Sequence, residues 1–420
     1  MKILMVGSGG REHALIRKLK ECSRVDEIIC APGNGGISFD AQCFSVDAGD
    51  VCGMVKLAQE QGVDIVFVAP DDPLAAGMVD EMERVGIKAF GPQKNAAEIE
   101  SSKVFSKDLM KKYAIPTAAY EIFDDPEAAL NFINIQNQYP VVIKADGLAL
   151  GKGVVIAESY DEAEDAVNSM MKDKIFGDSG NRVVIEEYLT GPEVSVLAFT
   201  DGKTIAPMVS SMDHKRAFDG DTGPNTGGMG AISPNPYYNA DMAERCMESI
   251  FMPTVHAMND EGRPFKGCLY FGLILTSDGP KVIEYNSRFG DPETQVILPR
   301  LITPLIDIIE AVIEERLDTV DIKWSDKACA CIMMASGGYP GEYEKDIPIS
   351  GLDKNGQIID VFVYHSGTKI TENIFKTNGG RVLGVTALGD TIEEALLLAY
   401  SGVSKINFDK GFYRRDIGTR

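Results

Sequence analysis

The chain contains the stretch Lys281-Val-Ile-Glu284-Tyr-Asn286-Ser-Arg288-Phe-Gly-Asp291-Pro-Glu293, in which a short β-strand pattern runs into a polar turn. Side chains alternate faces along a strand, so Glu284 and Asn286 are expected to point the same way, with Arg288 in the same parity just beyond. A carboxylate and an amide oxygen about 7 Å apart suit a hard cation such as Mg²⁺. The stretch therefore predicts a metal-assisted phosphoryl-transfer site. The alternative is a polar strand end with a surface salt bridge.

The composition narrows the class of protein. The 420 residues predict two to four domains, and a hydrophobic content of 44% is ordinary for a folded globular chain. Asp and Glu number 63 against 41 Lys and Arg, which gives a net charge of −22. A field of that sign repels a nucleic-acid backbone, so no nucleic-acid partner is expected. An anionic substrate must then meet a locally basic cleft.

The cysteines, histidines and N-terminus indicate a cytoplasmic protein. The eight cysteines are scattered and form no C-x₂-C pair, which predicts reduced thiols. The four histidines do not cluster along the sequence, so no zinc site is expected. The first residues are typical of a strand and not of a signal peptide. No apolar run is long enough to cross a membrane. We expect a monofunctional chain.

The first hundred residues alternate strands with helices, which predicts a Rossmann-like parallel sheet with ligands at the carboxyl ends of its strands. The predicted strands are residues 3–6, 27–31, 65–69 and 88–90, and the predicted helices are 12–20, 55–61 and 75–85.

The remainder has mixed α and β patterns, so the fold class is α/β and α+β, multidomain. Strands are predicted at 141–144, 154–157, 183–187, 193–199 and 328–335, and helices at 101–113, 161–171, 241–258, 305–315 and 391–406. We expect domains at 1–101, 102–326 (with a small lid at about 118–190) and 327–420, the last rich in β-structure.

Three loops are candidate anion sites. The first, Gly7-Ser-Gly9-Gly10-Arg11-Glu12, lacks the third glycine of a dinucleotide fingerprint, and Ala31 replaces the acid expected after the second strand. Its amides could still hold one phosphate beside Arg11, unless the glycines serve the turn alone.

The second loop is Asp146-Gly-Leu-Ala-Leu-Gly151-Lys152-Gly153. It joins two strands and lacks the Ser or Thr of a Walker loop, so we expect a hairpin that closes over a triphosphate. Lys144 precedes it, and Lys103 is a weaker candidate, because a lone helical lysine is usually solvated.

The third loop runs through Asp213-His-Lys215-Arg216 and Thr222-Gly-Pro-Asn-Thr-Gly-Gly-Met-Gly230, and suits a second anionic or amino-acid ligand. His214 is interpreted as structural. A strand end at Glu186 and Glu187 could offer its backbone to an adenine and a carboxylate to a ribose.

Together these segments resemble the ATP-grasp superfamily and, within it, the glycinamide ribonucleotide synthetase family. The matching runs are Gly7-Ser-Gly-Gly-Arg-Glu-His-Ala14, Ala31-Pro-Gly-Asn34, Lys144-Ala-Asp-Gly-Leu-Ala149, Gly151-Lys-Gly-Val154, Asp213-His-Lys-Arg216, Thr222 to Gly230 and Glu284 to Glu293. The resemblance implies that ATP, glycine and 5-phosphoribosylamine give glycinamide ribonucleotide, ADP and phosphate. It also implies a glycyl phosphate intermediate, Mg²⁺ or Mn²⁺ as cofactor, small-molecule partners only, and a monomer.

The resemblance also implies the site residues. Arg288 would stabilise the transferring phosphoryl group, and Glu284 and Asn286 would hold the metal. ATP would contact Lys103, Lys144, Gly147, Gly151, Lys152, Gly153, Glu186, Glu187, Leu189 and Glu193. The other substrates would face Gly9, Gly10, Arg11, Glu12, Asp213, Lys215, Asn225, Thr226, Gly290, Asp291 and Pro292.

The chain departs from the family pattern in two places. The strand Phe271-Gly-Leu-Ile-Leu275 offers no further metal carboxylate, and Asp71 stands where the family usually has Glu. The alternatives are another ATP-grasp carboxylate–amine ligase, a nicotinamide-dependent dehydrogenase and a non-catalytic nucleotide sensor. Phosphate release that needs both glycine and phosphoribosylamine would separate them.

Overall fold

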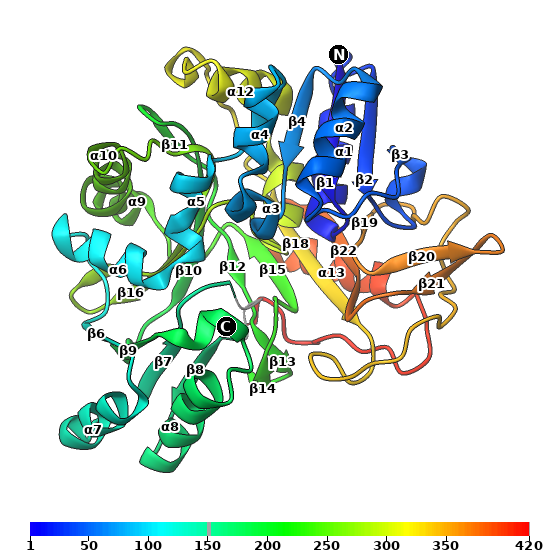
Figure 1. Ribbon diagram of the computed structural model, residues 1–420. Coiled ribbons are helices and arrows are strands. Elements are labelled where there is room, and N and C mark those ends of the chain that lie inside the picture. Colours follow the sequence, from blue (N-terminus) through cyan, green and yellow to red (C-terminus); the bar gives the residue numbers. More distant parts are fainter. Residues whose placement is uncertain (149–152, 420) are drawn as a thin grey trace.

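The computed structural model describes residues 1–148 and 153–419. Figure 1 shows several sheets packed together, with the lid helices α7 and α8 projecting at the lower left and the hairpin β20–β21 at the right. The chain has the predicted mixed α/β, multidomain architecture. Within the described residues, no helix has the length and apolar character needed to cross a membrane.

The first sheet is parallel throughout and has the order β3-β2-β1-β4-β5, which confirms the predicted Rossmann-like arrangement. Its strands are β1 (Lys2–Gly7), β2 (Glu27–Pro32), β3 (Gln42–Cys43), β4 (Ile65–Val68) and β5 (Lys88–Phe90). The helices among them are α1 (Gly10–Lys20), η1 (Ile37–Phe39), α2 (Val51–Gln61), α3 (Asp71–Ala76) and α4 (Met78–Arg84). The strand order reverses between β1 and β4, so the Gly7 turn and Asp71 meet at the crevice where such sheets bind ligands.

The single helix predicted at 75–85 is wrong. Gly77, with φ of 92°, ends α3 and separates it from α4. Apolar periodicity continues across this break, so the pattern does not reveal it. The strand β3 is also unpredicted, because two residues are too few to show alternation.

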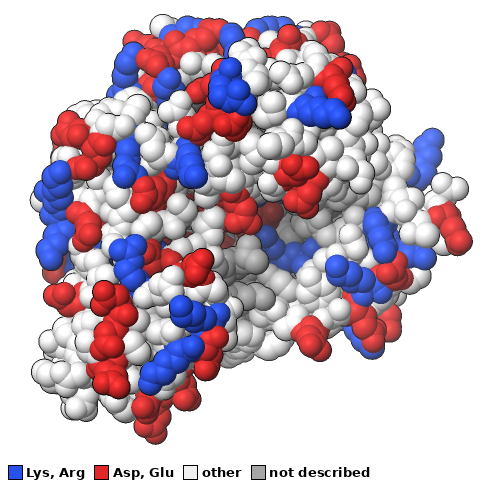
Figure 2. Space-filling model, viewed as in Figure 1, with Lys and Arg blue, Asp and Glu red and all other residues white. Residues whose placement is uncertain are grey.

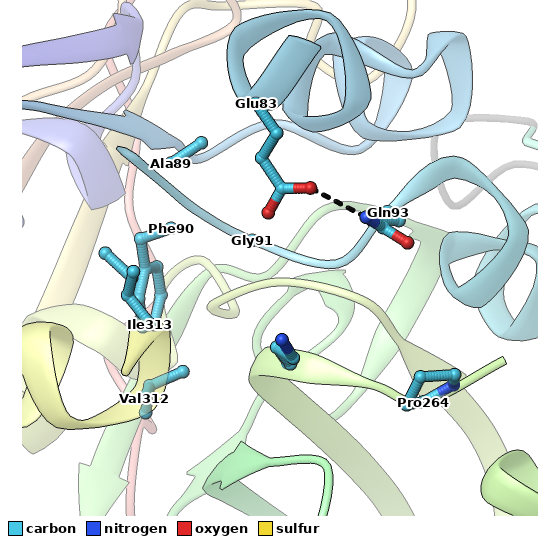
Figure 3. Close-up of a pocket in the computed structure, with 9 residues that line it drawn as sticks. Glu83, Ala89, Phe90, Gly91, Gln93, Pro264, Val312 and Ile313 are labelled. Atoms are coloured by element: carbon cyan, nitrogen blue, oxygen red, sulfur yellow. Dashed lines mark hydrogen bonds between the residues drawn. The ribbon is translucent and has the colours of Figure 1, made fainter. Parts of the chain in front are cut away.

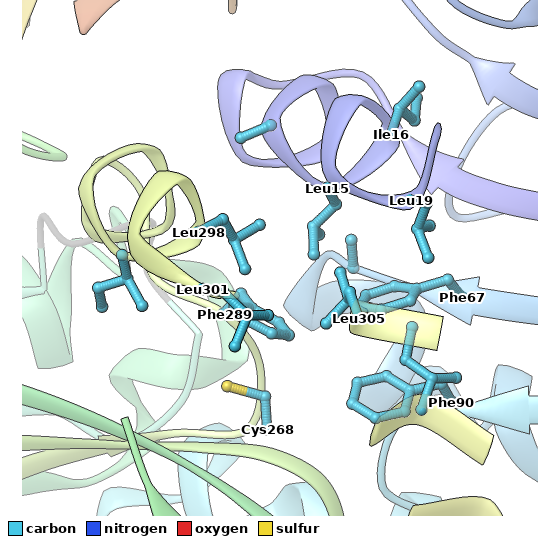
Figure 4. Packing of buried hydrophobic residues seen from close by; sticks show 14 of the residues in the cluster. Leu15, Ile16, Leu19, Phe67, Phe90, Cys268, Phe289, Leu298, Leu301 and Leu305 are labelled. Atoms are coloured by element: carbon cyan, nitrogen blue, oxygen red, sulfur yellow. The ribbon is translucent and has the colours of Figure 1, made fainter. Parts of the chain in front are cut away.

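The first sheet is fixed to the centre of the molecule by a shared core. Ile3 and Met5 face one hydrophobic cluster, whereas Leu4 and Val6 face another. Figure 4 shows the first cluster, in which side chains of α1 and of strands β4 and β5 meet those around residues 298–305. The N-terminal sheet is therefore packed directly behind the polar turn that follows residue 286.

The lid is a four-stranded sheet of order β6-β9-β7-β8 with a core of its own. Its strands are β6 (Tyr120–Phe123), β7 (Val141–Ala145), β8 (Val154–Ala157) and β9 (Val183–Glu187). The helical segments are α7 (Pro126–Gln136), α8 (Tyr160–Val167), the π-helical η2 (Asn168–Lys172) and η3 (Gly177–Asn181). The antiparallel pairing of β7 with β8 confirms the predicted hairpin. The predictions for Gly151 and Lys152 lie outside the described residues.

The central sheet is antiparallel, with the order β11-β10-β16-β17. Its strands are β10 (Glu193–Asp201), β11 (Ile205–Pro207), β16 (Lys266–Thr276) and β17 (Gly279–Asn286). The helices before and after it are α5 (Lys94–Ser101), α6 (Lys103–Lys112), α9 (Ala240–Cys246), η4 (Met247–Phe251), α10 (Met252–Asp260), α11 (Glu293–Ile297), η5 (Leu298–Arg300), α12 (Leu305–Ile313) and η6 (Leu317–Thr319).

The helix predicted from residue 101 begins later, at Lys103. The Ser102 side chain accepts a hydrogen bond from the amide of Phe105, so a serine caps α6 as expected, but Ser101 ends the preceding helix α5. The sequence pattern does not predict α5.

The last sheet joins two distant parts of the chain. Its order is β12-β15-β18-β22-β19, formed by β12 (Met212–Asp213), β15 (Gly230–Ser233), β18 (Ala328–Ala335), β19 (Phe362–His365) and β22 (Arg381–Gly389). The helix α13 (Ile392–Val403) packs on it, and two hairpins lie nearby: β13 (Arg216–Phe218) with β14 (Thr222–Asn225), and β20 (Thr368–Thr371) with β21 (Ile374–Thr377). Strands from the third loop thus belong to a C-terminal sheet. The domain boundaries themselves remain predictions.

Candidate active site

The polar residues of β17 lie in a basic environment. Glu284 Oε1 is 3.2 Å from Nζ of Lys215, which comes from the third loop. The charges of Lys215, then of Lys144 and Lys103, lower the pKa of Glu284 to about 2 even though burial opposes this. Glu284 is therefore a carboxylate at neutral pH, surrounded by three ammonium groups from three segments. In the view of Figure 1, the molecular surface is hollowed near its centre, and charged side chains lie in the hollow (Figure 2).

Arg288 is held by oxygens from the strand β17 and from the helices α3 and α5. Its Nη2 donates to Asn286 Oδ1 at 3.0 Å and lies 2.9 Å from Oε1 of Glu100 and 3.8 Å from Oδ2 of Asp71. Burial would lower the pKa of Arg288, but Glu100 and Asp71 more than compensate and raise it. Arg288 Nε is buried without a hydrogen-bond partner in the described part of the chain. The guanidinium thus stays charged and keeps one donor unused.

Glu100 was not predicted as part of the site. Its Oε2 accepts hydrogen bonds from the amide and the hydroxyl of Ser287, both at 2.7 Å. Burial raises the pKa of Glu100, and Arg288 opposes that rise. Because α5 is not visible in the sequence pattern, no sequence signal pointed to this residue.

Lys103 of α6 and Lys144 of the lid strand β7 lie near Glu284. Lys103 Nζ donates to the carbonyl of Gly147 at 2.8 Å, and Lys144 Nζ donates to the carbonyl of Ile283 at 3.0 Å. Burial lowers the pKa of Lys103, while Glu284 opposes this. Gly153 closes the described end of the loop, where its carbonyl accepts from the amide of Ala145 at 2.9 Å.

The four acidic and apolar residues predicted for adenosine differ in their surroundings. Glu186 is buried between Lys107 and Lys144, at 2.9 Å from each. Glu187 is exposed and accepts from the amide of Ala119 at 2.9 Å. Leu189 lies part-exposed after β9, and Glu193 is exposed at the start of β10. Only the last three present side chains to solvent.

The first glycine loop is already occupied by carboxylates. Glu12 accepts from the amide of Gly9 at 2.6 Å and from Nε of Arg11 at 2.8 Å, and Asp291 Oδ2 accepts from the amide of Arg11 at 3.2 Å. Two of the amides that could cradle a phosphate therefore have internal acceptors. A Cβ on Gly10 would lie 2.5 Å from the hydroxyl oxygen of Ser366 and 2.8 Å from Nε2 of Gln295, so a larger residue there would require these side chains to move. The phosphate role of this loop stays a prediction.

The third loop packs against the turn after β17. A Cβ on Gly228 would lie 2.4 Å from Cδ of Pro292 and 2.6 Å from Oδ1 of Asp213. Thr226 Oγ1 donates to the carbonyl of Lys215 at 2.8 Å. Burial and then the charge of Glu293 raise the pKa of Asp213. Asn225 lies beside this group in β14, and Gly290 accepts from the amide of Thr294.

A second missed residue comes from the C-terminal sheet. Arg381 Nη1 donates to the carbonyls of Gly227 at 2.6 Å and Asp291 at 2.8 Å, and lies 3.3 Å from Asp291 Oδ1. Burial would raise the pKa of Asp291, but Arg381 and then Arg11 lower it. Arg381 follows two glycines in a segment without any recognisable motif, so the sequence did not indicate it.

The expectation that the histidines do not cluster is wrong in space. His13 and His365 have ring centroids 5.6 Å apart, and the amide of His365 donates to Nδ1 of His13 at 2.8 Å. Yet among residues 1–148 and 153–419 no group of three His, Cys, Asp or Glu side chains is suited to a metal.

His214 is structural as predicted, since its Nε2 accepts from the amide of Gly418 at 3.0 Å. The eight cysteines are all free thiols.

A small cavity elsewhere is unrelated to this site. It measures about 70 Å³ and lies between the first sheet and the central part of the chain, where Gln93 donates to Glu83 at 2.7 Å (Figure 3). Phe90, Val312 and Ile313 form its apolar wall. None of the predicted site residues lines it, so the charged group around Glu284 and Arg288 is the stronger candidate for chemistry.

Comparison with known proteins shows the family of the chain. Three family models match: the N domain of phosphoribosylglycinamide synthetase over residues 1–100, its ATP-grasp (A) domain over 101–294 and its C domain over 329–420. A phosphoribosylamine–glycine ligase of Caldanaerobacter subterraneus subsp. tengcongensis is 48% identical over 99% of each chain. One of Clostridium acetobutylicum is 46% identical over 100% of this chain and 99% of its own.

Solved structures give the same result. A phosphoribosylamine–glycine ligase from Thermotoga maritima superposes with a TM-score of 0.86 at 31% identity, over 100% of both chains. The biotin carboxylase domain of the Hydrogenobacter thermophilus 2-oxoglutarate carboxylase, solved with MgADP and bicarbonate, has a TM-score of 0.72 at 17% identity over 98% of this chain and 91% of its own. At that identity the second match shows the fold alone.

Proposed function

The chain belongs to the phosphoribosylglycinamide synthetase family and is an ATP-dependent phosphoribosylamine–glycine ligase of purine biosynthesis, and from this premise we propose which of its residues do the chemistry. The observation that supports the assignment best is the convergence on Glu284 of Lys103, Lys144 and Lys215. Three cations around one ionised carboxylate suit a triphosphate with its metal ion, because opposite charges then alternate through the site.

Glu284 and Asn286 would hold Mg²⁺ or Mn²⁺. Both are oxygen ligands, and the low pKa of Glu284, about 2, keeps its carboxylate charged. When bound, the ion would neutralise charge on the transferring phosphoryl group. Asn286 Oδ1 now accepts from Arg288, so metal binding requires that this hydrogen bond be exchanged. The remaining ligands would be phosphate oxygens and water.

The lid would cover ATP. Lys103, Lys144 and the loop from Gly147 to Gly153, with Gly151 and Lys152, would contact the phosphates. Glu187, Leu189 and Glu193 would contact adenosine, and their exposure supports this. Glu186 is buried between two lysines, so its carboxylate would not be free to contact adenosine. It would act through the lysines that it pairs with.

The remaining residues would bind glycine and phosphoribosylamine. They surround the turn at Asp291, which receives hydrogen bonds from the first loop and from Gln295. The set comprises Gly9, Gly10, Arg11, Glu12, Asp213, Lys215, Asn225, Thr226, Gly290, Asp291 and Pro292. Carboxylates such as Glu12 and Asp291 suit an amine and sugar hydroxyls better than a phosphate.

The reaction would proceed in two steps. A carboxylate oxygen of glycine attacks the γ-phosphorus of ATP, which forms glycyl phosphate and releases ADP. The sugar amine then attacks the carbonyl carbon, the C–N bond forms, the C–O bond to phosphate breaks, and the phosphate departs with the amine's proton. Arg288, charged and with one buried donor unused, would stabilise the phosphoryl group and the oxyanion. The lid would exclude water from glycyl phosphate.

Phosphate release from ATP tests this assignment. We expect release only when glycine, phosphoribosylamine and a divalent metal are all present, and loss of release when the metal is chelated. Rapid release with glycine alone, or with a different amine at an equal rate, would overturn the assignment. The matched variants are Glu284→Gln for the metal and Arg288→Ala for the transfer step.

We also propose that the protein acts in the cytoplasm as a monomer. Eight free thiols support a reducing compartment. Light scattering coupled to size exclusion, which should report the 45.6 kDa of one chain, tests the second point.

A further inference from the structure

A lysine outside the predicted site is buried where the lid meets the central sheet. Lys107 of α6 is 2% exposed, and its Nζ lies 2.9 Å from Glu186 Oε2. The other oxygen of that carboxylate, Oε1, lies 2.9 Å from Nζ of Lys144. Glu186 is itself only 4% exposed. One buried carboxylate is therefore shared by two ammonium groups.

Lys107 also connects the lid to the central sheet. Its Nζ donates to Oγ1 of Thr117 at 2.8 Å, and Thr117 donates to the carbonyl of Val282 at 2.8 Å. Val282 belongs to β17 and Glu186 to β9, the lid strand. A single ammonium group thus joins α6, the lid and the strand that carries Glu284.

The charges of this cluster do not cancel. Lys107 and Lys144 carry two positive charges against one negative charge on Glu186, so one unit of positive charge remains. Without Lys107, Lys144 would be the one ammonium group paired with Glu186 in the described part of the chain, and that pair would have no net charge. A carboxylate buried against a single lysine would then hold that lysine away from any other anion.

We propose that Lys107 is a positioning residue for ATP: it neutralises Glu186, so that the charge of Lys144 is available to the triphosphate. This rests on the proposed phosphate contact of Lys144. Lys107 itself does not need to touch the nucleotide.

The cluster should make ATP binding depend on pH. Burial lowers the pKa of Lys107 to about 8, with Glu186 opposing the fall and Lys144 adding to it. The other groups that face Lys107 are Glu187 of β9 and Tyr120 of β6, whose ring centroid lies 5.6 Å from its Nζ. A bound triphosphate favours the protonated lysine, so affinity should be full below this pKa and fall as the pH rises through it.

The test is calorimetric binding of the ATP analogue adenosine 5′-(β,γ-imido)triphosphate with Mg²⁺, across the range from about pH 7 to pH 9.5. We expect the affinity of the wild type to fall about tenfold over this range. This is the change expected if binding of the triphosphate raises the pKa of Lys107 by about one unit. Lys107→Met should bind about tenfold more weakly at neutral pH and show little further loss. Lys107→Arg should keep its affinity at high pH, because an arginine does not deprotonate there.

The control is Lys111→Met, which removes an exposed lysine from the same helix and should bind like wild type. AMP is a second probe, since a nucleotide without β- and γ-phosphates should lose less affinity in Lys107→Met. Equal affinities of Lys107→Met and wild type, or the same alkaline loss in Lys107→Arg as in wild type, would overturn the inference. If Lys107→Arg does not fold, Lys107→Met provides the same test, because its affinity for the analogue should not change with pH. If wild type itself does not bind the analogue, the proposed function fails instead.

Discussion

Replacing Arg288 by alanine should affect catalysis and stability through different partners. In wild type the guanidinium lies 2.9 Å from Glu100, which is 7% exposed, and donates to Asn286 at 3.0 Å. Alanine removes the cation proposed to face the transferring phosphoryl group. It also leaves Glu100 as a buried charge whose remaining hydrogen-bond donors come from Ser287.

The two effects have different sizes. Removing one preorganised donor to a developing negative charge lowers kcat by about 10²-fold or more, which corresponds to about 2.7 kcal/mol. Removing one partner of a buried ion pair costs about 3–5 kcal/mol of stability. The pKa of Glu100, already raised by burial, rises further without Arg288. The loss of stability should therefore be largest well above that pKa and shrink as the pH falls through it, because protonation of Glu100 then removes the buried charge.

The double variant Arg288→Ala/Glu100→Gln separates the effects. A neutral glutamine can still accept from Ser287, so the double variant should recover most of the urea midpoint but none of the lost kcat. Steady-state phosphate release at saturating substrates measures the second quantity. Near-wild-type turnover of Arg288→Ala would refute the catalytic role, and a double variant as unstable as the single one would refute the ion-pair explanation.

Three further predictions concern the metal, the lid and the C-terminal sheet. Glu284→Gln should raise the Mg²⁺ concentration for half-maximal rate by at least about 10-fold, because even indirect metal contacts contribute that much; an unchanged metal titration contradicts the ligand assignment. Lys152→Ala should chiefly weaken the use of ATP, and unchanged KM and kcat for ATP would remove that loop from the mechanism. Arg381→Gln should raise the KM for phosphoribosylamine about tenfold, since it releases the carbonyls of Gly227 and Asp291. The KM for ATP is its internal control, and an equal rise in both constants would indicate a general loss of structure.

The parts of the fold that were predictable are those carried by local patterns. The strand β18 and the lid strand β9 coincide with the predicted ranges, because alternation or a continuous apolar run marks both ends. Breaks between helices were harder to predict from the sequence. Gly77 interrupts a helix without changing its apolar spacing, and α5 is a short segment of eight residues with no predicted cap.

The site residues also divide into those that a local pattern predicts and those that it does not. Glu284, Asn286 and Arg288 could be grouped from sequence because one strand and its turn carry all three. Glu100 and Arg381 could not, since their partners lie far away in the chain: the pairs Glu100–Arg288 and Arg381–Asp291 depend on how whole sheets pack. The pairing of His13 with His365 was missed for the same reason. Site residues that act across an interface leave no local signal.

The pairing of β15 with β18 has a consequence for how the enzyme becomes active during synthesis. The strand β15, which follows the loop at residues 213–230, pairs with β12 on one side and with β18 (Ala328–Ala335) on the other, so its second neighbour is synthesised about a hundred residues later. A nascent chain would therefore order the proposed nucleotide site before the proposed amine site, because the sheet beside the third loop is complete only once β18 has joined β15.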